Sequence, residues 1–292
     1  MEIPEATQRQ SLTALGFVLD GKMAHVPSWR PDVLGEADLV EEVARIASLT
    51  KLQGKPLPRV LPGVPKPILS PVQKREQAAR RAGAALGFHE CVSYSFIDQA
   101  AAALFGAGSD ATRLENPISA DMSHMRPDLL PGLLAAAQRN QARGFADLAL
   151  FEIGPVFSGG EPEEQGLQIA GLLIGRSAPK DVHASDREVD LFDVKADALA
   201  ILGAIGAPAK TQIRRGAASW WHPGRHGQIC LGPKKTLAVF GELHPKILAA
   251  FDIKGPAVGF TIWPNEVPLP RNSLPTRPAL KLKDLQAVER DF

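Results

Sequence analysis

The residues best suited to chemistry are four carboxylates near the start of the chain, Asp32, Asp38, Glu41 and Glu42. The last three are spaced i, i+3 and i+4, so in a helix their side chains share one face, and Asp32 lies on the approach to it. Several oxygen ligands without His or Cys favour a hard cation such as Mg²⁺. The alternative is that these acids complement the helix dipole, with Asp38 and Glu41 forming a capping box.

The element that must position these acids is a helix, which the sequence predicts from Glu36 to Ser48. Its apolar side chains form one stripe, and the acids lie on the opposite side. The stripe consists of Leu39, Val43, Ile46 and Ala47. Before it the sequence predicts a short helix over residues 5–16 and two strands, 17–20 and 23–27, joined at Gly21-Lys22. This part of the chain is therefore predicted to be a small helix-and-hairpin unit.

A proline-rich stretch follows over residues 51–71, which contains six prolines. Proline is disfavoured in helix interiors and central strands, so the stretch predicts an extended linker and a domain boundary. Residues 264–278 are again rich in proline, and the chain stops at Phe292 as though inside a strand. Because both ends look cut, we expect a fragment of a longer protein.

The central run of the chain, residues 114–157, predicts a strand, a tight loop, a helix and a strand in succession. The helix is expected from Asp128 to Arg143, with Pro131 in its first turn and Gly144 just past its end, where a left-handed cap needs glycine. The strand from Asp147 to Phe157 has apolar residues on both faces, which is typical of a strand inside a sheet.

Other elements surround this run. Helices are predicted over 72–86 and 192–205, and a half-buried strand over 90–97, with Val92, Tyr94 and Phe96 on its apolar face. Further strands are predicted at 167–175, 210–215, 228–231, 236–243 and 257–263. This order indicates an α+β domain with a mainly antiparallel sheet.

Composition limits the classes of function. The chain has 292 residues, of which 45% are hydrophobic, and its net charge of +1 gives no global attraction to nucleic acid or to an anionic membrane. The two cysteines, Cys91 and Cys230, are too few to suggest a disulfide framework, which favours a reducing cytosol. No run of 18 or more apolar residues occurs. We therefore expect a soluble cytoplasmic protein.

Several ordered motifs resemble a known family. They are VPSWRPD with DLVEEVARI, then NPIS, D-M-S-x-M-R, LLPGLL, R-N and LFEIG, then WWHPGRHGQICL and FGELHP. In this order they resemble the β subunit of bacterial phenylalanyl-tRNA synthetase. The resemblance implies an inactive class II aminoacyl-tRNA synthetase-like module at 72–270, preceded by the end of a small winged or helix-turn-helix-like domain at 1–50 and the linker at 51–71. It also implies the first strand of a ferredoxin-like anticodon-binding domain in 271–292.

The same resemblance implies a function. The chain would be a non-catalytic part of phenylalanine–tRNA ligase that docks the catalytic α subunit and supports an α₂β₂ assembly. It would also help to position tRNA(Phe) for ATP-dependent phenylalanylation. Asp32, Asp38, Glu41 and Glu42 match the positions that bind Mg²⁺ at the contact with α, and residues 71–96 would face another subunit. Proofreading lies in an earlier part of the β subunit, so no editing is expected from this chain.

Two rival functions remain open. An independent ATP-dependent ligase would need an arginine at the position of Leu150, where class II enzymes hold the α-phosphate, and another arginine near the closing strand. No arginine occurs between Lys254 and Arg271, so we expect no catalytic residue. A stand-alone RNA-binding module would need a concentrated basic face. The candidates for such a face lie on the helix over 72–86 and are Lys74, Arg75, Arg80 and Arg81. We interpret them as a solvated face or a subunit contact rather than an RNA-binding surface.

A second cluster could suggest zinc. It consists of His222, Arg225, His226, Cys230 and His244. Its spacing fits no zinc-finger or H-E-x-x-H pattern. We favour the interpretation that these imidazoles cap turns beside Trp220 and Trp221.

Overall fold

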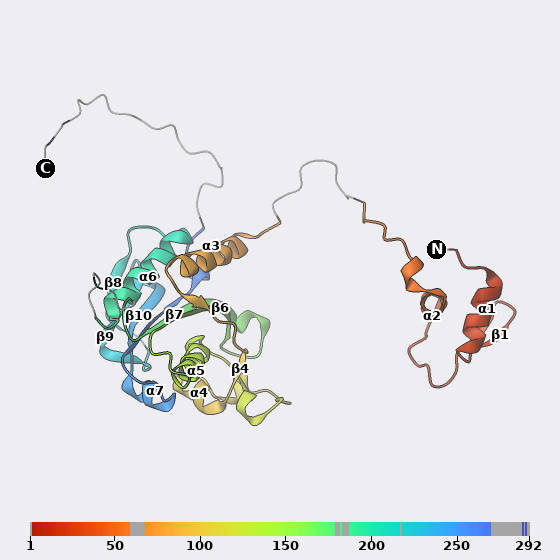
Figure 1. The fold of residues 1–292 in the computed structure, drawn as a ribbon, viewed down its shortest axis with the longest axis horizontal. Helices are drawn as coiled ribbons and strands as arrows, with labels where there is room; N and C mark the ends of the chain where they lie inside the picture. Colours follow the sequence, from red (N-terminus) through yellow and green to blue (C-terminus); the bar gives the residue numbers. More distant parts are fainter. Residues whose placement is uncertain are drawn as a thin grey trace. The chain divides into compact units, whose positions relative to one another are not determined.

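The computed structural model describes residues 2–58, 68–178, 182, 187–216, 218–269, 288 and 290. The chain divides into two compact units, Met1–Lys66 and Pro67–Phe292, and each is considered by itself (Figure 1). The division falls inside the predicted linker. Most of that linker's second half and nearly all of the predicted anticodon-domain strand lie outside the described residues.

The first unit consists of two helices and a hairpin, as predicted. Helix α1 (Glu5–Ala14) leads to strands β1 (Val18–Asp20) and β2 (Met23–His25), and helix α2 (Glu36–Ala47) is followed by the short turn η1 (Leu49–Lys51). Gly21 has φ +58° in the hairpin turn, a conformation that glycine adopts without strain. A small core holds the unit together and consists of Leu12, Phe17, Val33 and Val43.

The second unit is built on a seven-stranded sheet with the order β3-β6-β7-β11-β10-β9-β8. Its strands are β3 (His89–Glu90), β6 (Leu148–Phe157), β7 (Gln165–Ile174), β8 (Gln212–Arg214), β9 (Trp221–Leu231), β10 (Lys235–Leu243) and β11 (Ala257–Ile262). Neighbouring strands are antiparallel except β3 and β6, which are parallel. The fold is therefore α+β with a mixed sheet. A separate small sheet pairs β4 (Phe96–Ile97) with β5 (His124–Met125).

Helices cover both faces of the large sheet. Helices α3 (Pro71–Ala85) and α6 (Leu191–Ala204) pack on one face, and α4 (Gln99–Leu104), α5 (Leu130–Gln141) and α7 (Pro245–Ala250) lie on the other (Figure 1). Strand β6 separates the two cores as predicted: Phe151 belongs to the α3 and α6 side, and Leu150 belongs to the α5 side. Gly144 has φ +91° just after α5, which confirms the predicted helix end.

The predicted strand over 90–97 is wrong in its middle, and its faces are inverted. Only β3 and β4 form at its two ends. Val92 and Tyr94 are 93% and 70% exposed, whereas Ser93 points inward and donates from N and Oγ to the carboxylate of Glu152. A buried carboxylate requires donors, so the serine faces the interior. The strand expected at residue 114 is also absent, and only an isolated bridge joins Arg113 to His124.

The basic residues of α3 do not form one solvated face. Arg75 is buried and donates to the carbonyl oxygens of Pro264, Val267 and Pro268, and burial lowers its pKa. Arg80 forms ion pairs with Glu76 and Glu90. This geometry removes two of the four cations from any RNA surface. Within the described ranges, no helix combines the length and apolar character that crossing a membrane requires.

Candidate functional site

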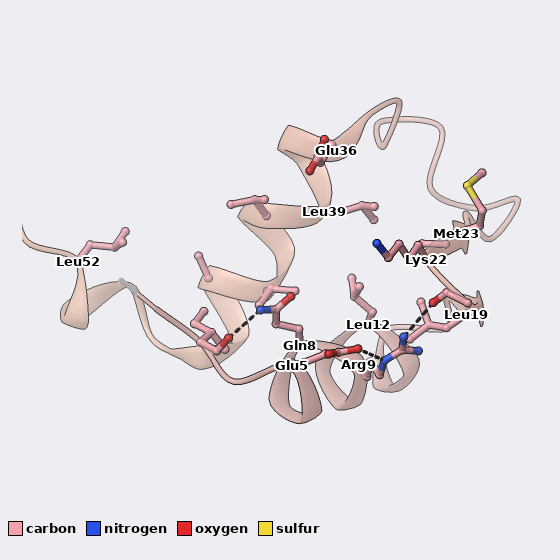
Figure 2. Close-up of a pocket in the computed structure, with 16 residues that line it drawn as sticks. Glu5, Gln8, Arg9, Leu12, Leu19, Lys22, Met23, Glu36, Leu39 and Leu52 are labelled. Carbon is pink, nitrogen blue, oxygen red and sulfur yellow. Dashed lines mark hydrogen bonds and ion pairs between the residues drawn. The ribbon is translucent and has the colours of Figure 1, made fainter.

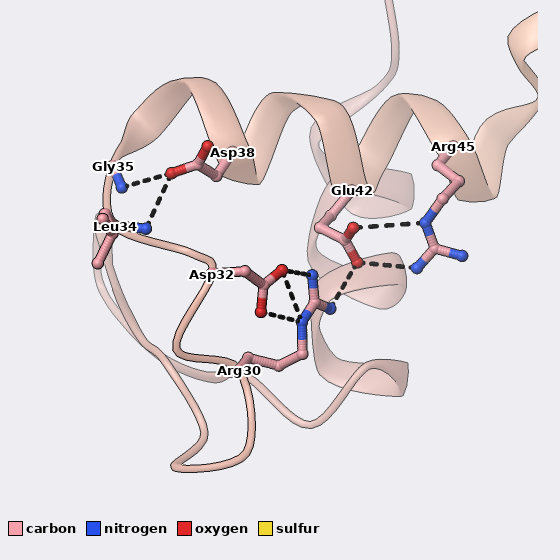
Figure 3. Close-up of polar contacts among 7 residues, drawn as sticks. All are labelled: Arg30, Asp32, Leu34, Gly35, Asp38, Glu42 and Arg45. Atoms are coloured by element: carbon pink, nitrogen blue, oxygen red, sulfur yellow. Dashed lines mark hydrogen bonds and ion pairs between the residues drawn. The ribbon is translucent and has the colours of Figure 1, made fainter. Parts of the chain in front are cut away.

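The acidic cluster of the first unit is organised around Arg30, which the sequence reasoning did not include (Figure 3). Its guanidinium donates to Asp32 from Nε and Nη2, with Nη2 2.7 Å from Oδ2, and from Nη1 to Glu42 Oε2 at 2.8 Å. The pKa of the Asp32 carboxyl is lowered mainly by its hydrogen bond with Arg30. Arg30 therefore supplies positive charge between two of the four predicted ligands.

Glu42 has a second cationic partner. Arg45 Nη2 lies 2.8 Å from Glu42 Oε2. The hydrogen bonds from Arg30 and then Arg45 lower the pKa of Glu42 to about 2. Glu42 is nearly buried, so these two arginines compensate for its loss of hydration.

Asp38 caps the start of α2, but with a different partner from the one predicted. Its Oδ2 accepts hydrogen bonds from the backbone N–H groups of Leu34 and Gly35, at 2.8 and 2.9 Å (Figure 3). In this capping box Gly35 is the N-cap and Asp38 is the third helical residue. The pairing of Asp38 with Glu41 is wrong because the helix begins one turn before the position that pairing needs.

The four carboxylates do not form one ligand set in this arrangement. Asp32, Asp38 and Glu42 are each engaged by donors of the chain itself, and only Glu41 makes no hydrogen bond or ion pair with the described residues. Among all the residues that the structure describes, no group of three or more His, Cys, Asp or Glu side chains is placed to hold a metal ion. The oxygen-only chemistry suits Mg²⁺, and binding would require three of the four carboxylates to exchange their present donors for the ion. The magnesium site stays a prediction.

A groove of about 780 Å³ lies on the other side of α2. Leu12 of α1, Leu19 of the hairpin and Leu39 of α2 contribute to its apolar wall, and the Glu5–Arg9 ion pair lies at its edge (Figure 2). Its α2 residues are offset around the helix from the acids. Helix α2 therefore presents an apolar side and an acidic side.

The second unit contains a buried ion pair between Arg126, just after β5, and Glu152 of β6. Arg126 Nη1 lies 2.6 Å from Glu152 Oε1, and both side chains are 3% exposed. Arg126 also donates to Ser93 Oγ and to the carbonyl oxygen of Pro155. Glu152 is therefore engaged by donors of the chain itself. Two residues earlier on β6, at the position where class II enzymes hold an arginine, Leu150 is a core residue.

A second buried polar group lies at the start of α5, and the sequence reasoning missed it. Asp128 Oδ1 accepts from Leu130 N at 2.9 Å, Gln168 Oε1 accepts from Leu129 N at 2.8 Å, and Gln168 Nε2 donates to Asp128 Oδ2. The two side chains satisfy the orphan amides of a buried helix end. Two signals could have found them: an Asp just before a helix start and a glutamine within an apolar strand.

Burial raises the pKa of Asp128 to about 6. The folded state then favours the protonated acid, so its contribution to stability is present below the unfolded pKa near 4 and is lost as pH rises through about 6. Relative to Asp128→Asn, the free energy of unfolding should fall by roughly 2 kcal/mol between pH 4 and pH 7. Urea titrations at pH 4, 5.5 and 7 measure it.

The control is Asp193→Asn. Its pKa is lowered by the hydrogen bond with Arg187, so its own pH effect lies below pH 4. The Asp193→Asn difference should change much less over the measured range, because only the contribution of Asp193 to the raised pKa of Asp197, which is smaller than that of burial, varies there. An equally small change for Asp128→Asn would contradict the raised pKa.

The histidines of the cluster that could suggest zinc accept hydrogen bonds from backbone amides, as the favoured interpretation predicted. His222 Nδ1 accepts from Gly224 N, His226 Nε2 accepts from Gly216 N, and His244 Nδ1 accepts from Lys246 N at the start of α7. Trp221 is buried, and Trp220 packs on Phe105 with a centroid distance of 5.5 Å. The cluster is thus structural in this geometry.

Comparison with known proteins places the chain in a family. Residues 57–263 match the phenylalanyl tRNA synthetase beta chain CLM domain, and residues 1–48 match the tRNA synthetase B5 domain. The chain belongs to the phenylalanyl-tRNA synthetase beta chain family. The resemblance seen in the sequence motifs is thereby confirmed.

Relatives in the phenylalanyl-tRNA synthetase beta chain family are similar along the whole chain. The phenylalanine–tRNA ligase beta subunit of Ruegeria pomeroyi is 74% identical over all 292 residues, and that of Cereibacter sphaeroides is 70% identical. The Rhodospirillum rubrum beta subunit is 46% identical over 99% of the chain. The chain spans only 36–37% of the length of these relatives.

A solved structure shows the same fold. The pyrrolysyl tRNA synthetase PylSc of Desulfitobacterium hafniense matches 91% of the chain, and 86% of its own length is covered. The TM-score is 0.51 at 15% sequence identity. The fold of this family member is therefore shared with a tRNA synthetase.

Proposed function

We propose that the chain is a non-catalytic part of the β subunit of phenylalanine–tRNA ligase, which docks the catalytic α subunit and supports an α₂β₂ assembly. It would also help to position tRNA(Phe) while α carries out ATP-dependent phenylalanylation in the cytoplasm. The observation that carries the proposal is the 74% identity over the entire chain with a named beta subunit. In this proposal the first unit is the end of the helix-turn-helix-like domain, and the second unit is the class II-like module.

The non-catalytic role is supported by the residues of β6. A class II enzyme needs a free arginine on this strand to bind phosphate, because charge develops there during activation. Here Leu150 is 6% exposed within the α5-side core, and the nearby Arg126 is committed to Glu152. Neither residue can bind a phosphate without disrupting the interior.

The assembly role is supported by exposed side chains in residues 71–96. Val92 and Tyr94 project outward because Ser93 is held by Glu152. Exposed aromatic and aliphatic side chains on a rigidly held backbone are typical of protein contacts. We infer that a second subunit covers them.

The proposal includes Mg²⁺ shared with α, with Asp32, Asp38, Glu41 and Glu42 as the ligands from this chain. The oxygen-only set supports it. Because Arg30 engages Asp32 and Glu42, we expect no tight Mg²⁺ binding by the chain alone. Binding would require the partner and a movement of Arg30.

The test is light scattering after size-exclusion chromatography of the chain mixed with α from the same organism, with and without Mg²⁺. Co-elution is expected, and Tyr94→Ser should reduce it several-fold, since it removes an exposed contact. The matched control is Phe145→Ser, which removes a 60% exposed ring outside residues 71–96. Glu41 makes no hydrogen bond or ion pair in the described structure. Glu41→Gln should therefore abolish the dependence of co-elution on Mg²⁺.

Separate elution in both conditions would contradict docking by this part of the β subunit. Equal effects of Tyr94→Ser and Phe145→Ser would contradict the assigned surface. Phenylalanine-dependent ATP–pyrophosphate exchange by the chain alone would contradict the non-catalytic role.

A further inference from the structure

A cavity of about 610 Å³ opens on the face of the large sheet opposite α3 and α6. Its lining includes Asp128, Trp220, Trp221, Thr261, Trp263 and Glu266. Thr261 lies between Phe260 and Ile262, which belong to the core on the α6 side, so its side chain lies on the opposite face of β11. Its cross-strand partner Val239 lines the same cavity and belongs to the α5-side core.

Two polar groups in this lining lack hydrogen-bond partners. Thr261 is 1% exposed, and neither its Oγ1 nor Trp220 Nε1 is paired within the described part of the chain. Buried polar groups in folded proteins are almost always paired, and unpaired ones require an explanation. A bound molecule in the cavity would provide the missing partners. The hydroxyl can donate or accept, and the indole N–H needs an acceptor atom.

The charge and aromatic content of the lining limit the class of ligand. The chain contains four tryptophans, and three of them line this cavity. The carboxylates of Asp128 and Glu266 also line it, and no Lys or Arg does so among the described residues. Lys235 pairs with Glu266 at 3.4 Å but is not part of the lining. Indole faces and carboxylates attract cations and disfavour anions such as phosphate.

We propose that this cavity binds a small aromatic ammonium compound. Its ring packs on the tryptophans, its ammonium group faces the two carboxylates, and a polar atom on the ring accepts from Trp220. The cavity volume lies in the range of small-molecule sites. The site is independent of the acidic cluster on α2 and of the proposed subunit contacts.

The experiment uses the full chain carrying Trp29→Phe, because the three remaining tryptophans all line the cavity. Their fluorescence, excited at a wavelength where phenols absorb little, then reports on this site alone. The probes are tyramine, the neutral alcohol tyrosol and the anion 3-(4-hydroxyphenyl)propionate, which share one ring and differ in charge. Tyramine should give a saturable change and bind at least fivefold more tightly than tyrosol. The anion should bind more weakly still.

Two variants locate the binding. Thr261→Val keeps the shape of the side chain and removes the hydroxyl, so tyramine binding should weaken about threefold to tenfold. Thr112→Val is the matched control, because Thr112 Oγ1 is also buried and unpaired but lies outside the lining. Glu266→Gln, at a half-exposed position that does not threaten folding, should reduce the preference for tyramine over tyrosol.

Any one of four results overturns the proposal. The first is the absence of any saturable change with tyramine. The second is equal binding of the three probes, which would show an apolar cavity without charge selection. The third is an equal loss of tyramine binding in Thr112→Val and Thr261→Val, and the fourth is an unchanged preference for tyramine over tyrosol in Glu266→Gln.

Discussion

Replacing Arg126 by methionine is expected to lower the free energy of unfolding by about 3–5 kcal/mol. Both members of the Arg126–Glu152 pair are 3% exposed, so the variant leaves the Glu152 carboxylate in the interior without its cation. Ser93 would remain as its donor, which does not balance a full charge. Urea unfolding at neutral pH, followed by circular dichroism, measures the loss.

The double variant Arg126→Met/Glu152→Leu separates the two contributions. It removes the unpaired charge, so it should be more stable than Arg126→Met alone, although a cost remains from the lost bonds to Pro155 and Ser93. The control is Arg9→Met, which breaks a pair whose members are 46% and 77% exposed. That loss should stay below about 1 kcal/mol. A similarly small loss for Arg126→Met would contradict the account of Glu152.

Helices and strand faces could be predicted from the sequence because their signals are local. Pro131 and Gly144 mark the two ends of α5, and the alternation along β6 assigns Leu150 and Phe151 to opposite cores. Each signal depends on residues within about one turn of helix or one strand. The order of the seven strands could not be derived in the same way, since it depends on contacts between distant segments.

The inverted segment around Ser93 shows where local reasoning fails. Its alternation is typical of a half-buried strand with Val92 and Tyr94 inside. The structure reverses this because Glu152, 59 residues later, is buried and needs the serine as a donor. A period of two gives the two faces but not which one is inward. The burial of Glu152 elsewhere in the chain decides which of the two faces points inward.

The acidic cluster shows a related failure. Spacing on α2 correctly places Asp38, Glu41 and Glu42 on one side, and Asp32 beside them. It cannot show that Arg30 donates to both Asp32 and Glu42. Arginine matches carboxylates with two parallel donors, so it competes directly with a metal ion for the same oxygens. Four acids that are predicted to converge therefore indicate a need for positive charge and do not identify its source.

Replacing Phe260 by alanine is expected to lower the free energy of unfolding by about 3–5 kcal/mol. Its ring is completely buried and meets Phe88 edge to face at a centroid distance of 5.9 Å. Directly across from it on β7 is Gly171, whose absent side chain leaves room for the ring. An added Cβ at Gly171 would overlap the Phe260 ring, so Gly171→Ala should also destabilise the fold. Thermal and urea unfolding measure both losses.

The losses of unfolding free energy in Phe260→Ala and Gly171→Ala should not be additive, because the Phe260 ring and a methyl group at Gly171 would occupy the same space. In Gly171→Ala/Phe260→Ala the new methyl group enters the volume that the ring vacates, so the double variant should lose clearly less than the sum of the single variants. Phe192→Ala, which removes a 65% exposed ring on α6, controls for loss of an aromatic side chain and should cost less than about 1 kcal/mol. Strict additivity would mean that the ring and the glycine are independent. The glycine in the middle of β7 would then need a reason other than the close packing of Phe260.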